Sequence, residues 1–471
     1  MTLPPDFLYG VAAAAYQIEG AVTEDGRGPS VWDTFCAEPG RIRDAETGAV
    51  ACDHYHRYAE DVALMRELGV GAYRFSISWP RVLPTGSGTV NPKGLDFYDR
   101  LVDELCAAGI APAATLFHWD TPQALEDAGG WVSRDTAYRL AEYAGHVGER
   151  LGDRVRMWMP LNEPVVHTMY GYAVGHHAPG KALGFEALPV VHHLLLGHGL
   201  AVRALRDAGC ESIGIASHHA PTWPASGSPE DVTAAETYHT LINWLFSDPV
   251  LTGRYPEGFD AAMPGPVEDD LKVISTPLDW FGINYYQPAL VAAAASSPPA
   301  AGSPTASGAG GAAASSTAAG PDGAMLPPGL PFELRTLTGY PATDFGWPVV
   351  PDGLREILVS FAQRYGDALP PVYVTESGCS YHDAGPDADG RVRDPERIAY
   401  HQGHLAAVAD AIAEGVDVRG YFAWSIMDNF EWAAGYQERF GLVYVDYETL
   451  KRTPKDSYHW YRDLIRRHQV R

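Results

Sequence analysis

Eight short, almost continuously apolar runs recur along the chain and are separated by longer stretches with a different pattern. The runs are FLYGVAAAA (7–15), GAYRFSIS (71–78), APAATLFH (111–118), VRMWMPLN (155–162), SIGIASHH (212–219), DWFGINYY (279–286), PVYVTES (371–377) and RGYFAWSI (419–426). Strands that are buried on both faces of a parallel sheet have such nearly continuous apolar sequences. The pattern therefore predicts eight strands of a parallel sheet.

The stretches between the runs have the periodicity of helices. Residues 58–69 and 95–109 place apolar side chains at i, i+3 and i+4, and both stretches end in a glycine, which is a common helix stop. Eight strand–helix units close well as a (β/α)₈ barrel, so we predict a single catalytic barrel domain over residues 1–471. A doubly wound sheet is the alternative, but the chain has neither GxGxxG nor GxxxxGK at a strand–helix turn.

One segment interrupts this pattern. Residues 292–324 contain only Ala, Ser, Pro, Gly, Thr and one aspartate, Asp322, so no large apolar side chain is present to be buried. Such a composition predicts a flexible loop or linker. Because the strand-like runs on its two sides complete one repeat, we interpret it as a surface loop of the barrel domain.

Polar and aromatic residues gather where the predicted strands end, which in such barrels is where active sites lie. Glu163 follows the fourth strand and Glu376 ends the seventh. Two carboxylates among tryptophan, tyrosine, histidine and amide side chains favour sugar chemistry, in which the two acids divide the work of breaking a glycosidic bond. The candidates are Gln17, Arg74, His118, Trp119, Asn162, Glu163, Asn284, Tyr286, Glu376, Trp424, Glu431 and Trp432.

Structural explanations compete with this interpretation. A single strand-end glutamate could simply pair with Arg74, and the tryptophans could belong to the core. The histidine pairs 176–177, 192–193 and 218–219 resemble metal ligands, but adjacent residues point to opposite faces of a strand and HExxH is absent. Two carboxylates with the same aromatic and amide surroundings favour catalysis without a metal or cofactor.

The net charge and the cysteines of the chain limit the classes of partner and the location that we expect. The formal net charge of −25 disfavours binding to nucleic acid and to anionic membranes. The five cysteines show no CxxC spacing, which disfavours zinc or redox sites and favours a reduced, cytoplasmic location. The N-terminal residues lack the features of a signal peptide, and no run of 18 uncharged apolar residues predicts a membrane span.

Several motifs together resemble one enzyme family. They are YQIEGA with GRGPSVWDTF (16–35), DHYHRY (53–58), YRFSISWPRVLP (73–84), LDFYDRLVDEL (95–105), TLFHWDTPQAL (115–125), LNEP (161–164), FGINYY (281–286), TESG (375–378) and FAWSIMDNFEWAAGYQERFGL (422–442). In this order, over nearly the whole chain, they resemble the β-glucosidases of glycoside hydrolase family 1.

The resemblance implies a retaining β-glucosidase that hydrolyses terminal β-D-glucosyl residues of cellobiose, short cello-oligosaccharides and aryl or alkyl glucosides, with possible transglycosylation. It implies Glu376 as nucleophile and Glu163 as acid/base. Gln17, His118, Asn162, Tyr286, Trp424, Glu431, Trp432 and Phe440 are implied to bind substrate. Arg74 and Asn284 are implied to tune the nucleophile, which Tyr286 also positions.

The resemblance leaves questions open. Ser377 stands where the family usually has asparagine, and Pro160 where threonine is usual. The serine concerns the exact position of Glu376, and so the rate of the reaction more than its type. An inactive sugar-binding module would be expected to lose a carboxylate, and this chain keeps both. A galactose, fucose or 6-phosphosugar glycone is a nearer alternative, and the oligomeric state is undetermined.

Overall fold

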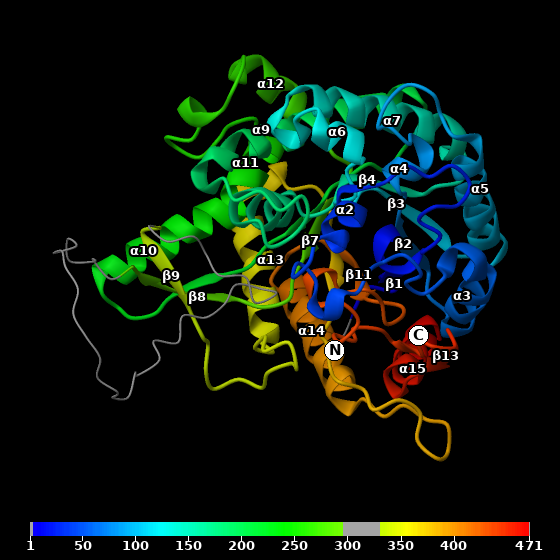
Figure 1. The fold of residues 1–471 in the computed structure, drawn as a ribbon. Coiled ribbons are helices and arrows are strands. Elements are labelled where there is room, and N and C mark those ends of the chain that lie inside the picture. Colours follow the sequence, from blue (N-terminus) through cyan, green and yellow to red (C-terminus); the bar gives the residue numbers. More distant parts are fainter. Residues whose placement is uncertain (1–2, 295–329, 471) are drawn as a thin grey trace, which may run out of the picture.

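Eight parallel strands form the centre of the computed structural model, which describes residues 3–294 and 330–470 (Figure 1). The strands are β1 (Leu8–Ala12), β2 (Ala72–Ser76), β3 (Ala111–Phe117), β4 (Met157–Leu161), β5 (Ala216–His218), β7 (Phe281–Asn284), β10 (Val372–Ser377) and β11 (Val418–Trp424). Their order, β4-β3-β2-β1-β11-β10-β7-β5, follows the chain around a ring. The predicted (β/α)₈ barrel is confirmed.

The ring closes between β4 and β5 through two parallel bridges rather than a continuous ladder. Trp158 pairs with Ile213, and Asn162 pairs with Ala216. Pro160 lies between these two bridges, and a proline has no N–H to donate to a ladder. The strand therefore meets its neighbour again at Asn162, directly before Glu163.

Helices cover the barrel on the outside, as the periodicity predicts (Figure 1). They include α3 (His54–Leu68), α5 (Pro92–Ala107), α7 (Asp135–Leu151), α9 (Leu188–Asp207), α11 (Leu245–Thr252), α12 (Val267–Ile274), α13 (Pro351–Tyr365), α14 (Pro395–Ala413) and α15 (Asp456–Gln469). In α5 a proline occupies the first turn, and Leu101, Val102 and Leu105 form part of the buried face. Gly109 follows with a φ of 75°, a conformation that stops the helix at little cost in glycine.

Shorter helical segments position loops around the barrel. They are α1 (Ala15–Ile18), α2 (Val31–Ala37), α4 (Trp79–Val82), α6 (Gln123–Asp127), α8 (Pro164–Val166), α10 (Pro229–His239) and the wider turns η3 (His167–Val174) and η5 (Thr240–Trp244). Helix α1 begins inside the run 7–15 that the sequence places in a strand. The alanines there permit either structure, and the strand ends at Ala12.

A second sheet lies outside the barrel, next to α10 (Figure 1). It contains β6 (Thr222–Pro224), β8 (Ala289–Ala293) and β9 (Phe332–Arg335), and a separate hairpin joins β12 (Val443–Val445) to β13 (Arg452–Pro454). The prediction that the loop begins at residue 292 is wrong for its first two residues. Ala292 and Ala293 belong to β8 because their backbones pair with Glu333 and Phe332 of β9. Residues 295–324 lie outside the described part of the chain.

One helical segment in the described ranges, Gly184–Asp207, has the length and composition of a membrane span. The sequence criterion of 18 uncharged residues does not detect it. In the fold, 72% of its most apolar window is buried against protein. Helix α9 within it packs mainly against α7, as the core helix of a globular protein does.

Candidate active site

Glu163 follows β4 in a strained turn that directs the chain out of the barrel. Its φ is 43°, in the left-handed region that non-glycine residues rarely adopt. The Glu163 N–H donates to Ala216 O over 2.8 Å, and Pro164 begins α8 immediately afterwards. Such backbone strain costs about 1–3 kcal/mol and persists where neighbours fix the conformation, most often at functional sites.

Glu376 lies in β10 and is held by two donors. Arg74 of β2 donates through Nη1 to Glu376 Oε1, and Tyr286 donates its phenol proton to Oε2 over 2.7 Å. Arg74 and Glu376 are almost completely buried. Because each carboxylate oxygen accepts a bond from a fixed donor, the arrangement fixes the orientation of the carboxylate.

An amide network connects the two glutamates. Arg74 Nη2 donates to Asn162 Oδ1 over 2.6 Å. Asn284 Nδ2 donates to Glu163 Oε1 over 2.9 Å and lies 3.1 Å from the same Asn162 oxygen. Thr375 in turn donates its hydroxyl to Asn284 Oδ1 over 2.6 Å. Four barrel residues, Arg74, Asn162, Asn284 and Thr375, thus form one hydrogen-bonded layer that positions both carboxylates.

His118 is held as a neutral ring. Its Nε2 lies 2.9 Å from Asn162 Nδ2. The Asn162 oxygen already accepts from Arg74, so the amide nitrogen is the donor and His118 Nε2 accepts. Burial, with the nearby charge of Arg74, lowers the pKa of His118 well below its usual value. The proton of the neutral ring is therefore on Nδ1, which can donate to a ligand.

Indoles and other aromatic rings wall the cleft above this layer. Trp432 packs between Trp119 and Trp32, with ring centroids 4.8 and 4.5 Å away, and His118 stacks on Trp424. The lining residues are His118, Trp119, Glu163, Val166, Tyr170, His218, Tyr286, Gln287, Trp347, Glu376, Trp424, Glu431, Trp432 and Phe440. The predicted Trp119, Trp424, Trp432 and Phe440 thus lie in the cleft wall.

Gln17 lies behind this wall, on α1. Its Nε2 donates to Phe430 O over 2.8 Å and to Asn429 Oδ1 over 3.0 Å, and lies 3.3 Å from Glu431 Oε2. Its Oε1 is buried and has no hydrogen-bond partner among the described residues. This amide oxygen is held beside a cleft carboxylate and is suited to accept a hydrogen bond from a hydroxyl group of a ligand.

Five lining residues are additions to the sequence-based set: Val166, Tyr170, His218, Gln287 and Trp347. His218 ends β5, and its Nδ1 lies 3.8 Å from Glu163 Oε1. Its position at the end of a strand run is the signal in the sequence that identifies it. Gln287 directly follows the run 279–286, so the same signal identifies it, whereas Trp347 follows no strand end of the barrel and no pattern in the sequence identifies it.

The two departures from the family motifs lie at the edge of the site. Ser377 is buried, and its Oγ lies 3.2 Å from Tyr400 Oη. Pro160 is inside β4, at the interruption described above. Neither residue is among those that line the cleft. Glu376 keeps both its donors with Ser377 beside it.

The histidine pairs have other partners. His192 and His193 lie on helix α9 and not on a strand, so the two-face argument does not apply to them. His192 instead contacts Tyr255 and Asp270, and His193 contacts Trp131 O. Within residues 3–294 and 330–470, no three His, Cys, Asp or Glu side chains form a group that could hold a metal ion.

Two buried carboxylates at the strand ends of a (β/α)₈ barrel, in a cleft walled by indoles and amides, define a glycoside hydrolase. The sequence profile of glycosyl hydrolase family 1 matches residues 1–470, and the chain belongs to that family. It is a hydrolase of the β-glucosidase class, with a small-molecule sugar as substrate.

Known relatives cover the whole chain. It is 47% identical to the thermostable beta-glucosidase B of Thermobispora bispora, over 100% of this chain and 92% of that protein. It is 44% identical to a bifunctional beta-D-glucosidase/beta-D-fucosidase of Bifidobacterium breve, with both chains covered in full. The structure of a beta-glucosidase from Thermotoga maritima in complex with galacto-hydroximolactam superposes with a TM-score of 0.88 at 41% identity, covering 100% of this chain and 99% of that one.

Proposed function

We propose that this protein is a retaining exo-β-glucosidase that removes the terminal non-reducing β-D-glucosyl unit from cellobiose, short cello-oligosaccharides and aryl or alkyl β-glucosides. The observation that carries the proposal is that two neighbouring glutamates receive different hydrogen-bond donors. Glu376 receives the guanidinium of Arg74 and the phenol of Tyr286, whereas Glu163 receives the neutral amide of Asn284. A carboxylate held by a cation and a phenol is suited to act as the nucleophile, and one held by a neutral amide is suited to act as the general acid.

In the first step Glu376 attacks the anomeric carbon, and the bond to the leaving oxygen breaks while Glu163 transfers its proton to that oxygen. Asn284 donates to Glu163 Oε1 and so helps to fix the orientation of the acid group. A covalent glucosyl-enzyme is formed with inversion at the anomeric carbon.

In the second step a water molecule attacks the same carbon and gives its proton to Glu163. The bond to Glu376 breaks, and the second inversion restores the β configuration. The negative charge of Glu376 favours the protonated form of Glu163 before the first step. Glucosylation removes that charge, so Glu163 is ionised when a base is required. A second sugar that takes the place of the water would give transglycosylation.

The glycone is recognised by Gln17, His118, Asn162, Glu431 and Trp432. The Gln17 acceptor, the Nδ1 proton of His118 and the Glu431 carboxylate can form hydrogen bonds with sugar hydroxyls, and the Trp424 indole in the cleft wall can pack on the apolar face of the ring. A carboxylate at this position disfavours a phosphorylated sugar because two negative charges would meet in a poorly solvated site. Fucose differs from galactose only in lacking the 6-hydroxyl, so the bifunctional relative makes β-fucosides a second glycone to assay.

The proposal is tested by trapping the intermediate with a 2-deoxy-2-fluoroglucoside that carries a dinitrophenol leaving group. The fluorine slows both steps, and the good leaving group restores only the first, so the glucosyl-enzyme accumulates. We expect the protein to lose activity in step with the labelling of one residue, and peptide mass spectrometry to place the label on Glu376. A label on another residue, or turnover without labelling, would exclude this mechanism.

A further inference from the structure

One loop, residues 425–442, carries a large part of the glycone site. It leaves the barrel after β11 and ends at β12. The two limbs of the loop meet at its base, where the Leu442 N–H donates to Ser425 O over 2.9 Å. The position of the cleft side chains on the loop therefore depends on how this base is held. Those side chains are Glu431, Trp432 and Phe440.

Asp428 joins the two limbs through its side chain, which is completely buried. Its Oδ2 accepts from Arg439 Nη1 over 2.7 Å, and its Oδ1 accepts from the Gly441 N–H over 3.0 Å. Both donors belong to the returning limb. A third donor, Lys455 Nζ, lies between β13 and α15 and is 2.6 Å from Oδ1. One carboxylate thus fastens the loop to itself and to the hairpin behind it.

The two limbs approach each other so closely at Gly441 that no side chain would fit there. A Cβ atom at this position would overlap with the backbone nitrogen of Asp428 and with the carbonyl carbon of Met427. Only a glycine allows its N–H to reach the Asp428 carboxylate in this arrangement. The base of the loop is therefore tightly packed as well as charged.

The charges around Asp428 form a buried network. Lys455 is completely buried and also contacts Asp383, which pairs with Arg397. Arg397 in turn donates to Arg439 O over 2.6 Å, so the network returns to the loop. Buried charges are costly unless each one is paired. Loss of the Asp428 charge would leave Arg439 and Lys455 with one carboxylate fewer at the base of a loop that lines the cleft.

The effect of Asp428 reaches the cleft over three residues. The next residue, Asn429, accepts at Oδ1 from Gln17 Nε2 over 3.0 Å. The same Gln17 nitrogen lies 3.3 Å from Glu431 Oε2. Asp428 therefore holds the backbone from which two side chains, Asn429 and Glu431, meet Gln17 of the glycone site.

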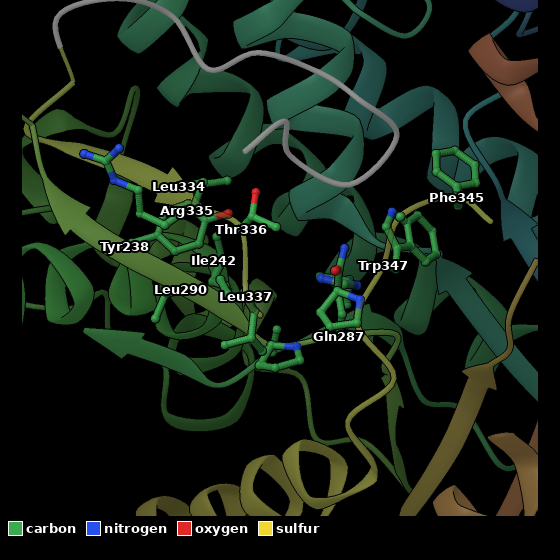
Figure 2. Close-up of a pocket in the computed structure, with 16 residues that line it drawn as sticks. Tyr238, Ile242, Gln287, Leu290, Leu334, Arg335, Thr336, Leu337, Phe345 and Trp347 are labelled. Atoms are coloured by element: carbon green, nitrogen blue, oxygen red, sulfur yellow. The ribbon is translucent and has the colours of Figure 1, made fainter. Parts of the chain in front are cut away.

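Phe440, on the returning limb, has apolar support as well. Its ring centroid lies 6.3 Å from that of Phe345 and 5.8 Å from that of Trp347. Figure 2 shows Phe345 and Trp347 on the segment before α13. These ring contacts do not depend on the charge of Asp428. We therefore expect the loss of that charge to affect Glu431 more than Phe440.

We propose that Asp428 is a positioning residue for the glycone, whose carboxylate holds the loop 425–442 so that Glu431 meets the sugar hydroxyls. The proposal rests on the proposed function, because it assumes a glucosyl unit beside Glu431. Asp428 is not among the residues that line the cleft, so its effect passes through the loop. It should contribute to the recognition of individual hydroxyl groups rather than to the chemistry at the anomeric carbon.

The test compares the unmodified enzyme with Asp428→Asn on 4-nitrophenyl β-glucoside and on its analogues that lack the hydroxyl at C4 or at C6, both remote from the anomeric carbon. Asparagine keeps the shape of aspartate, but its NH₂ group would face donors instead of accepting from them. In the unmodified enzyme, deletion of a hydroxyl that Glu431 bonds should lower kcat/KM by about 10- to 100-fold.

In Asp428→Asn, kcat/KM for the glucoside itself should fall by about tenfold or more, because the bond between Glu431 and the sugar is misaligned. The further loss on deleting that hydroxyl should then shrink to about threefold or less, since little of the bond is left to remove. If each deletion lowers kcat/KM by the same factor in the variant and in the unmodified enzyme, the proposal is overturned.

Asp248→Asn is the matched control. Asp248 is a buried aspartate on α11 that accepts from Arg364 Nε over 2.8 Å and is not among the residues that line the cleft. Its replacement should lower the melting temperature and leave the effect of each hydroxyl deletion unchanged. A reduced effect in this control as well would mean that any weakened ion pair has the same consequence, and would overturn the specific role of Asp428.

A milder variant keeps the test decisive if Asp428→Asn does not fold. Arg439 is partly exposed, so Arg439→Met removes one partner of Asp428 without leaving the rest of the network open. It should reduce the effect of the hydroxyl deletion in the same direction, and an unchanged effect would overturn the proposal. If the unmodified protein does not hydrolyse 4-nitrophenyl β-glucoside, the proposed function fails. If it does, and the variants keep the full effect of each deletion, only the role of Asp428 fails.

Discussion

The phenol of Tyr286 donates a hydrogen bond to Glu376 Oε2 over 2.7 Å. Burial, followed by the charges of Glu376 and Glu163, raises the pKa of Tyr286 well above its usual value. The phenol therefore keeps its proton at the pH values at which the enzyme works. It stabilises the carboxylate charge before attack, and the same bond must weaken once Glu376 becomes an ester, so Tyr286 also affects how easily the intermediate forms and breaks.

Replacing Tyr286 with phenylalanine should lower kcat on 4-nitrophenyl β-glucoside by about 10- to 100-fold, because a hydrogen bond to a charged group contributes roughly 1.5–3 kcal/mol. Steady-state kinetics measure the loss. The neighbouring Tyr285 provides the control, since its phenol donates to Val350 O over 2.7 Å and not to a carboxylate. Tyr285→Phe should remove a buried hydrogen bond and cost stability, with kcat unchanged. Equal loss of kcat in both variants would show that Tyr286 acts only on the fold.

Glu163→Ala should affect substrates according to their leaving groups. Cellobiose leaves as a basic alkoxide that requires a proton, so its hydrolysis should fall by about 10²–10⁴-fold. Dinitrophenolate needs no proton, so glucosylation by a dinitrophenyl glucoside should change little. A stopped-flow burst of dinitrophenol followed by slow turnover is the expected signature, because deglucosylation still lacks its base. Similar losses in the first step on both substrates would argue against an acid role.

Glu431 should determine whether an unmodified glucosyl unit is preferred. Glu431→Ser should reduce turnover of 4-nitrophenyl β-glucoside by orders of magnitude, because a carboxylate bonded to sugar hydroxyls is lost, and it should relieve the repulsion of a 6-phosphate. The ratio of kcat/KM for the two substrates measures the preference. The unmodified enzyme is expected to cleave the glucoside and not its 6-phosphate. Faster cleavage of the phosphorylated substrate by the unmodified enzyme would contradict the glycone assignment.

The stability of the protein should depend on pH through buried neutral histidines such as His198. Burial lowers the pKa of His198 to about 3, and neither ring nitrogen has a hydrogen-bond partner in the described part of the chain. The unfolded value is about 6.5, so between these two values the unfolded chain binds a proton that the folded chain does not. The free energy of unfolding therefore decreases as the pH falls below about 6.5.

His198→Leu should remove the part of this dependence that comes from His198. The melting temperature of the variant relative to the unmodified protein should be higher at pH 5 than at pH 7.5, by an amount equivalent to roughly 2 kcal/mol. His459→Leu is the control, because His459 is exposed on α15. Its melting temperature relative to the unmodified protein should be the same at both pH values. A constant difference for His198→Leu as well would mean that His198 is not kept neutral by the fold.

The sequence was sufficient to predict the barrel and its two carboxylates because both depend on local patterns. Apolar runs locate the strands, and Glu163 and Glu376 are adjacent to runs that the fold could only bury. The side-chain network is different. Arg74, Asn162 and Asn284 come from three strands, and only the closed barrel brings them together. Their hydrogen bonds could not be derived from spacing.

Two other features could not be predicted from the sequence, for related physical reasons. Ala292 and Ala293 have no apolar periodicity, so their place in β8 depends on pairing with β9, about 40 residues away in the chain. Trp347 lies in a segment that forms neither a helix nor a strand, and nothing around it in the sequence indicates that it reaches the cleft.

The central claim is that Glu376 forms the covalent intermediate, and Glu376→Gly tests it most directly. The variant should have almost no activity on 4-nitrophenyl β-glucoside, because the nucleophile of the first step is lost. Azide added at high concentration should occupy the vacated space and restore cleavage. The account predicts that proton NMR will show α-glucosyl azide, the product of a single inversion. β-Glucosyl azide, or full activity without azide, would contradict the assignment of Glu376.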